Sequence, residues 1–259
     1  MLTIRKSQLE AFGEVARRSF EDKMLDHLAG FSPPLVKAAG EAQLRKSIHL
    51  GVTRAGRYGL THQGPVRLYL ELMLLFGAHF DTDPQYPWAA RILLEPGPVS
   101  QQQRAEWLFE KTLEHQARAV GPQDDYASCV RRAIRFLTEM SLATLTDENF
   151  LPDMLRELKK ADSPRFVHVG IEGVEALIRR GLEAARSQQL SSVRGMALTF
   201  MLMWVFGHGC LEDPLQPWIA QALGDTATSE PEDRASLLKT RTFAWLEQLL
   251  AHHAEGARS

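Results

Sequence analysis

Cysteine is scarce in this 259-residue sequence: only Cys129 and Cys210 are present, far apart and without partners at the spacing of a metal site. We expect both to be buried, reduced thiols, because two distant cysteines give no sign of a disulfide framework. The sequence also has no glycine-rich phosphate loop, no nucleophile elbow and no CxxC motif. These absences predict no catalytic residue, no resident metal and no cofactor, and they favour a function other than an enzyme.

An excess of charge of one sign is also missing. The chain has 30 lysines and arginines against 32 acidic residues, a formal net charge of −2, so we expect no nucleic-acid partner. No polybasic run is present to hold the chain on an anionic membrane. The longest apolar run, residues 196–207, is too short for a membrane span of roughly 20 residues, and the first residues lack the apolar core of a signal peptide. The expected location is the cytoplasm.

Apolar residues do recur at helical spacing along the chain, and they predict an all-α fold. One apolar stripe covers residues 5–29 and should end at Ser32-Pro33-Pro34, because proline breaks a helix. Further helices are predicted over 41–57, from a cap at Thr61 to about Phe80, over a short segment ending near Leu94, and from Ser100 to about residue 118. The segment 165–169 has a composition that suits a strand, but no second strand is available to pair with it.

A second signal is internal repetition. Residues 51–93 align without a gap on residues 181–223 at an offset of 130, with fourteen identical positions out of 43 where chance gives roughly three. The sequence therefore predicts two tandem copies of one helical module, residues 1–122 and residues 123–259, packed together. The identical pairs are Gly51/Gly181, Ala55/Ala185, Leu60/Leu190, Leu68/Leu198, Leu72/Leu202, Met73/Met203, Phe76/Phe206, Gly77/Gly207, Asp83/Asp213, Pro84/Pro214, Pro87/Pro217, Trp88/Trp218, Ala90/Ala220 and Leu93/Leu223.

Two features of each predicted copy bear on its architecture. The helix predicted over 61–80 and its counterpart, residues 196–206, are apolar nearly all round, so each should be the central helix of its copy. Ser100 with Gln103 resembles a capping box that opens a helix, and Ser229 with Glu232 resembles another.

The repeat contains a shared motif, Gly-x5-Asp-Pro-x-x-Pro-Trp, which we interpret as structural. An aspartate before proline suits a turn or cap, the second proline suits the first turn of a helix, and the tryptophan should bury its ring against the central helix. Its residues are Gly77, Asp83, Pro84, Pro87 and Trp88 in the first copy, and Gly207, Asp213, Pro214, Pro217 and Trp218 in the second.

His79, Asp81 and Asp83 resemble a set of metal ligands, since a divalent cation needs such side chains to converge. The second copy has no counterpart of His79 or Asp81, and no H-E-x-x-H or EF-hand spacing is present. We therefore predict a solvated helix end here, with a metal-dependent hydrolase using these three residues as the alternative function. His208 and Cys210 are too close in the chain to be expected as a base and a nucleophile.

Positions that differ between the copies are candidates for a specific contact. Arg54, Arg57 and Tyr58 end a predicted helix, and the second copy has alanine, serine and glutamine there. Arginine and tyrosine are favoured in protein interfaces. We predict that these residues, with His79 and Asp81, contact a partner protein; the alternative is an ordinary exposed helix end.

Three stretches of the first copy carry a family resemblance. They are Ile4-Arg5-Lys6-x-x-Leu9-x-x-Phe12 with the following Arg18-x-Phe20-Glu21-x-x-Met24, then Tyr58-Gly59-Leu60-Thr61, then residues 72–89 with the run Phe80-Asp81-Thr82-Asp83-Pro84. Together they resemble a family of bacterial all-helical proteins associated with genes for type VI secretion spikes and effectors. The resemblance implies a protein partner, a secreted effector or a spike component, and an accessory role as adaptor, chaperone or immunity protein. It brings no catalytic chemistry with it.

Overall fold

The computed structural model describes residues 6–119, 125–225 and 230–258, and within these ranges the regular structure is helical, without a strand. The all-α prediction is therefore confirmed. The predicted boundary between two copies, near residue 122, and the predicted cap Ser229 lie outside the described residues. No helix among the described residues combines the length and the apolar character needed to cross a bilayer.

The elements of residues 6–119 are six α-helices and a short 3-10 helix. They are α1 Lys6–Phe31, α2 Pro33–Ala39, α3 Glu41–Arg57, α4 Gln63–Phe76, η1 Phe80–Thr82, α5 Pro87–Leu93 and α6 Gln101–Ala119. The later elements are α7 Tyr126–Glu139, α8 Phe150–Ala161, α9 Ser163–Val169, α10 Ile171–Ser187, α11 Val193–Phe206, α12 Pro217–Leu223 and α13 Pro231–Gly256. The pairs α2/α9, α3/α10, α4/α11 and α5/α12 have equal lengths and begin 130 residues apart.

Local chemistry accounts for most helix ends. α1 ends at Phe31, before Ser32-Pro33-Pro34 as predicted, and Pro33 begins the short helix α2, which was not predicted. The amide of Gln103 donates to Ser100 Oγ at 3.1 Å in the predicted cap of α6. The cap predicted at Thr61 is wrong, because α4 begins one residue later, after His62. The amides of Thr61 and His62 both donate to the side-chain oxygen of Gln101 at 2.8 Å, so a residue of α6 satisfies them.

Two other predicted elements differ from the structure. The central helix of the first half ends at Phe76, not near Phe80, because Gly77 turns the chain with a φ of 95° and only a 3-10 turn follows. Residues 165–169 belong to the short helix α9, not to an extended segment. Pro164 in its first turn suits a helix start, and α9 packs against α6, α8 and α10. These tertiary contacts outweigh the strand preference of its valines and phenylalanine.

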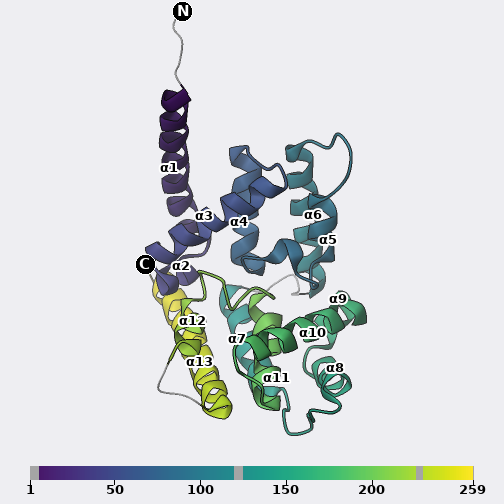
Figure 1. Cartoon of the computed structure of the whole chain (residues 1–259). Coiled ribbons are helices and arrows are strands. Elements are labelled where there is room, and N and C mark those ends of the chain that lie inside the picture. The colour runs from purple at the N-terminus through teal and green to yellow at the C-terminus, as the bar shows by residue number, and fades with distance from the viewer. Residues whose placement is uncertain (1–5, 120–124, 226–229, 259) are drawn as a thin grey trace, which may run out of the picture.

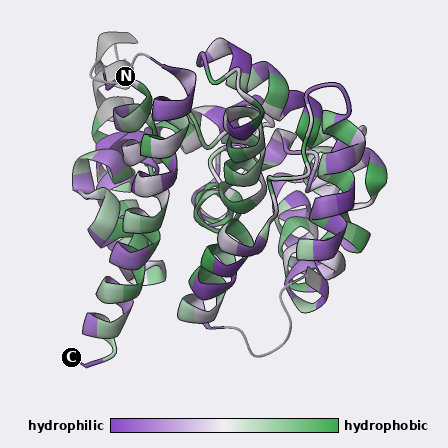
Figure 2. Cartoon of the chain, turned by 90° about the horizontal axis from the view of Figure 1, so that it is seen from below, coloured by the Kyte–Doolittle hydropathy of each residue, from purple (hydrophilic) through white to green (hydrophobic). Residues whose placement is uncertain are grey.

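Helices of the first half of the chain pack against helices of the second half in two places. The early helix α2 packs against the last helix α13, and α9 packs in the same way against α6. Figure 1 shows α2 beside α12 and α13, although these helices are far apart in the sequence. Figure 2 shows polar and apolar residues alternating along most helices, as expected for helices that bury one face.

The two central helices are buried to different degrees. Residues 195–204 of α11 are all buried, in agreement with its apolar sequence. Helix α4 buries Tyr69, Leu70, Leu72 and Met73 but leaves Leu75 44% exposed, so one of its faces reaches the surface. The prediction of an all-round buried central helix therefore holds for α11 and only in part for α4.

Helix α1 extends beyond the body of the protein. Its second half buries Met24, Leu25 and Leu28 against neighbouring helices, and α1 packs on α2, α3 and α4. Its first half stands clear of the other helices in Figure 1, and the side chain of Val15 is 66% exposed. In the sequence, the apolar stripe of this helix also includes positions of this first half.

Candidate functional site at the junction of two Asp-Pro loops

The loops that follow α4 and α11, residues 77–86 and 207–216, pack against each other. Each begins with a glycine of positive φ, Gly77 at 95° and Gly207 at 88°. A Cβ atom on Gly207 would lie 2.5 Å from the carbonyl oxygen of Phe76, and one on Gly77 would press equally on the carbonyl oxygen of Phe206. Only glycine therefore permits this close approach of the two chain segments.

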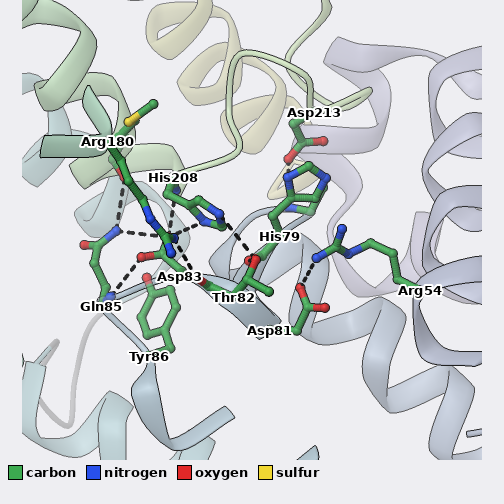
Figure 3. A network of polar contacts seen from close by, with 12 residues as sticks. Arg54, His79, Asp81, Thr82, Asp83, Gln85, Tyr86, Arg180, His208 and Asp213 are labelled. Atoms are coloured by element: carbon green, nitrogen blue, oxygen red, sulfur yellow. Dashed lines mark hydrogen bonds and ion pairs between the residues drawn. The ribbon is translucent and has the colours of Figure 1, made fainter. Parts of the chain in front are cut away.

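The two motif aspartates join these loops by reciprocal hydrogen bonds (Figure 3). Asp83 Oδ2 accepts from the amide of His208 at 2.7 Å, and Asp213 Oδ2 accepts from the amide of Ala78 at 3.0 Å. The Oδ1 atom of each aspartate accepts at 2.8 Å from the amide two residues further along its own loop. Each aspartate thus braces its own turn and ties it to the other loop. Burial raises the pKa of Asp213 to about 6, against the opposing effect of the two amides.

Three of the five residues predicted to contact a partner contact one another. Arg54 Nη2 donates to Asp81 Oδ1 at 2.5 Å, and the Tyr58 hydroxyl donates to Asp81 Oδ2 at 2.7 Å. Arg54 and Asp81 are buried. Desolvation, followed by the hydrogen bond to Asp81, raises the pKa of Tyr58 to about 12, so its hydroxyl remains a donor at neutral pH. Arg57 is exposed, and His79 is half-buried.

The three residues predicted as an alternative metal site have separate contacts. Asp81 faces Arg54, whereas Asp83 faces the amides of His208 and Gln85 (Figure 3). Burial, followed by the charges of Arg54 and His208, lowers the pKa of His79. No group of three or more histidine, cysteine or acidic side chains in the described ranges is placed to hold a metal ion. The geometry therefore does not favour the hydrolase alternative.

The two cysteines have different surroundings. Cys210 is buried, as predicted, and burial raises the pKa of its thiol far above the usual range. Cys129, on α7, is exposed, so the prediction that it is buried is wrong. Its side chain lines a pocket together with Ala133 and Phe136 of the same helix, which leaves it accessible. His208 lies within 3.3 Å of Thr82 Oγ1 and 3.4 Å of Asp83 Oδ2, so its polar contacts are with the first loop.

The motif tryptophans lie against the last residue of their respective central helices. The Trp218 ring meets Phe206 edge-on at 5.8 Å, and its Nε1 donates to Gln216 Oε1 at 3.0 Å. The Trp88 ring meets Phe76 edge-on at 6.0 Å. Trp218 is buried and Trp88 half-buried. Both rings thus occupy equivalent surroundings at the corner after the loop.

A cluster that was not predicted from the sequence is centred on Arg165 at the start of α9. Arg165 Nη2 donates to Gln85 Oε1 at 2.8 Å and to the Tyr86 hydroxyl at 3.3 Å, and its guanidinium lies 4.5 Å from the Trp204 ring centroid. The position 130 residues earlier holds Leu35, a buried residue. Position 165, like position 54, therefore differs from its counterpart in the other half, and this difference is visible in the sequence.

A histidine pair lies beside this cluster. His115 Nδ1 is 2.9 Å from His168 Nε2, which joins α6 to α9. The His115 ring is 5% exposed and sits edge-on to Phe76 and Tyr86. Burial, followed by the charges of Arg165 and His168, lowers the pKa of His115 to about 3. The folded protein therefore holds His115 neutral at ordinary pH.

This pKa shift predicts a pH-dependent stability. The unfolded chain takes up a proton at His115 below its ordinary pKa of 6.5, whereas the folded chain does so only near 3. Stability contributed by neutral His115 is thus present above pH 6.5 and is lost as the pH falls through this window, by about 1.4 kcal/mol per pH unit. Denaturant unfolding between pH 7 and pH 4.5 measures the slope. The His115→Gln variant should have a shallower one, and equal slopes would contradict the assignment.

Comparison of the chain with protein-family models, with curated proteins and with solved structures finds no match. The function proposed below therefore rests on the residues and on their geometry.

Proposed function

We propose that this chain is a non-enzymatic helical module of the bacterial cytoplasm that binds another protein. The partner is a secreted effector or a spike component of a type VI secretion system, and the role is that of an adaptor, chaperone or immunity protein. The proposal includes a tandem duplication, which the equal lengths and the constant offset of four helix pairs support. The reciprocal hydrogen bonds of Asp83 and Asp213 support it further, since each half supplies the same bond to the other.

The arrangement of the polar centre supports a role other than catalysis. The carboxylates of Asp81, Asp83 and Asp213 accept hydrogen bonds from buried donors. A catalytic carboxylate needs to reach a substrate, whereas these three groups connect α3 and the two Asp-Pro loops. Their contacts suit a rigid frame that presents a binding surface elsewhere.

The single observation that carries the proposal is helix α1. Its sequence places Leu9, Phe12, Val15 and Phe20 at helical spacing, while the first half of the helix stands clear of the body (Figure 1). Val15 is 66% exposed. An amphipathic helix with an uncovered apolar stripe is a common docking element, because a groove on a partner can bury that stripe. We place the partner contact on this half of α1.

The test uses two variants of opposite faces of α1 that introduce the same charge. Phe12→Asp should weaken capture of the product of a neighbouring secretion gene at least tenfold, because a charge would enter the apolar contact. Ser7→Asp introduces the same charge about 140° or more around the helix from Leu9 and Phe12, at roughly 100° per residue, and should leave capture unchanged. Co-expression and affinity purification, with binding then measured by calorimetry, give the comparison.

Equal loss of binding in both variants would place the contact somewhere other than the apolar face of α1. If the unaltered chain, purified from its native organism, brings down neither an effector nor a spike component by mass spectrometry, the proposed partner class is wrong.

A further inference from the structure

A pocket of about 190 Å³ lies beside the junction of the Asp-Pro loops. Residues of α4, α6, α7, α9 and α11 line it together with the end of the first loop. Its aromatic lining comes from Phe76, Tyr86, Phe136 and Trp204, and Leu75 and the exposed Cys129 are also part of its wall. The pocket therefore combines both halves of the chain around an aromatic interior.

Arg165 gives this pocket a positive charge that no acidic side chain neutralises directly. Among the residues that the structure describes, Arg165 forms no ion pair; its contacts are with the neutral groups of Gln85, Tyr86 and Trp204. These contacts hold the guanidinium against the wall while the remaining nitrogens keep their donor capacity. A cation fixed in this way favours a carboxylate ligand, which can accept two parallel hydrogen bonds from it.

The other ionisable residues of the lining agree with an anionic ligand. Asp162 is acidic, but its Oδ2 accepts from Trp204 Nε1 at 3.1 Å, which anchors the carboxylate to the wall. His115 is neutral at ordinary pH and presents an aromatic edge. The carboxylate of Asp162 thus contacts Trp204, and in the described residues it forms no ion pair with Arg165.

Size limits the ligand. An apolar cavity of roughly 150 Å³ holds one benzene ring, and this pocket of about 190 Å³ leaves room for one additional small group. The four aromatic residues of the lining offer faces and edges to a planar ring. We propose that the pocket binds a monocyclic aromatic carboxylate, with the ring among these aromatic residues and the carboxylate on Arg165. This ligand site is separate from the partner contact placed on α1.

Cys129 provides a direct measurement of occupancy. Burial raises the pKa of both thiols, but Cys129 is exposed at the pocket whereas Cys210 is buried, so at mildly alkaline pH a neutral alkylating reagent should modify Cys129 selectively. Benzoate should slow the reaction of Cys129 with iodoacetamide in a saturable manner. Benzyl alcohol has the same ring without the charge, and it should protect at least tenfold less at equal concentration. Mass spectrometry of the intact chain follows both reactions.

Two variants and a control test the residues. Arg165→Met should weaken protection by benzoate about 10- to 100-fold, the effect of losing a charge-assisted hydrogen bond. Ala133→Phe fills the pocket from α7 and should abolish protection while Arg165 remains. Arg118→Met removes an exposed arginine that lines a different pocket, and it should leave protection unchanged. Thermal unfolding shows whether each variant is folded.

The comparison of benzoate with benzyl alcohol uses the unaltered chain, so it remains decisive even if a variant does not fold. If benzoate gives no protection at any concentration at which the protein stays folded, the proposal is wrong. Equal protection by benzyl alcohol would overturn the assigned charge recognition, as would full protection in folded Arg165→Met. Protection that persists in folded Ala133→Phe would place the ligand outside this pocket.

Discussion

Replacing Gly77 by alanine is expected to lower the free energy of unfolding by about 3–5 kcal/mol, and Gly207→Ala should do the same. Two effects add at each position. Gly77 has φ 95° and ψ 155°, a backbone region that is nearly restricted to glycine, and forcing another residue into it costs about 1–3 kcal/mol. The new Cβ would also press on the carbonyl oxygen of Phe206, and overpacking typically costs a further 1–3 kcal/mol or so. Chemical denaturation measures the loss.

A matched control separates the two effects. Gly40 ends α2 with φ 86° and ψ 157°, nearly the same backbone conformation, but nothing lies within 4 Å of its Cβ position. Gly40→Ala should therefore lose only the conformational part. The difference between Gly77→Ala and Gly40→Ala then measures the close approach of the two loops. Equal losses at the two positions would mean that the loops move apart at little cost, and the Asp-Pro junction would not be a rigid centre.

The comparison of copies and the local chemistry of proline and glycine predicted much of the fold. The helix over 41–57 has the predicted bounds, and α1 ends before Pro33 as expected. Helix α4 is different because its apolar run continues past Gly77, so periodicity alone suggested a longer helix. Residues 165–169 were ambiguous for a related reason: a seven-residue helix is too short to show a clear period, and tertiary contacts decide its conformation.

The site was less predictable because its contacts join distant residues. The motif was interpreted as a local turn and cap, and the aspartates do brace their own loops. The hydrogen bonds from the amides of His208 and Ala78 span 125 and 135 residues, and no local pattern reports them. The partner prediction for Arg54 and Tyr58 rested on a difference between copies. In the structure both residues contact Asp81, and their contact with a partner stays a prediction.

The second large effect is expected at this cluster. Arg54→Met should destabilise the protein by about 3–5 kcal/mol, because it leaves the Asp81 carboxylate buried without its cation. Arg57→Met, three residues along the same helix and exposed, should change stability by less than about 0.5 kcal/mol. Urea denaturation of both variants at pH 7 provides the measurement. A loss below about 1 kcal/mol for Arg54→Met would show that water reaches Asp81 and that the ion pair is not a buried one.

The second half of the chain suggests how this loss can be reversed. At the positions that correspond to Arg54 and Asp81 it has Ala184 and Leu211, two apolar residues that pack against the core. Replacing a buried ion pair by apolar residues is often neutral, because the cost of desolvating both charges disappears with their attraction. The double variant Arg54→Ala/Asp81→Leu should therefore recover at least half of the stability lost in Arg54→Met. Tyr58 loses its acceptor in this background, and Tyr58→Gln, which introduces the residue found at position 188, should recover more. If the double variant is as unstable as the single one, the two halves do not share an interchangeable frame, and the argument for a duplication loses its energetic support.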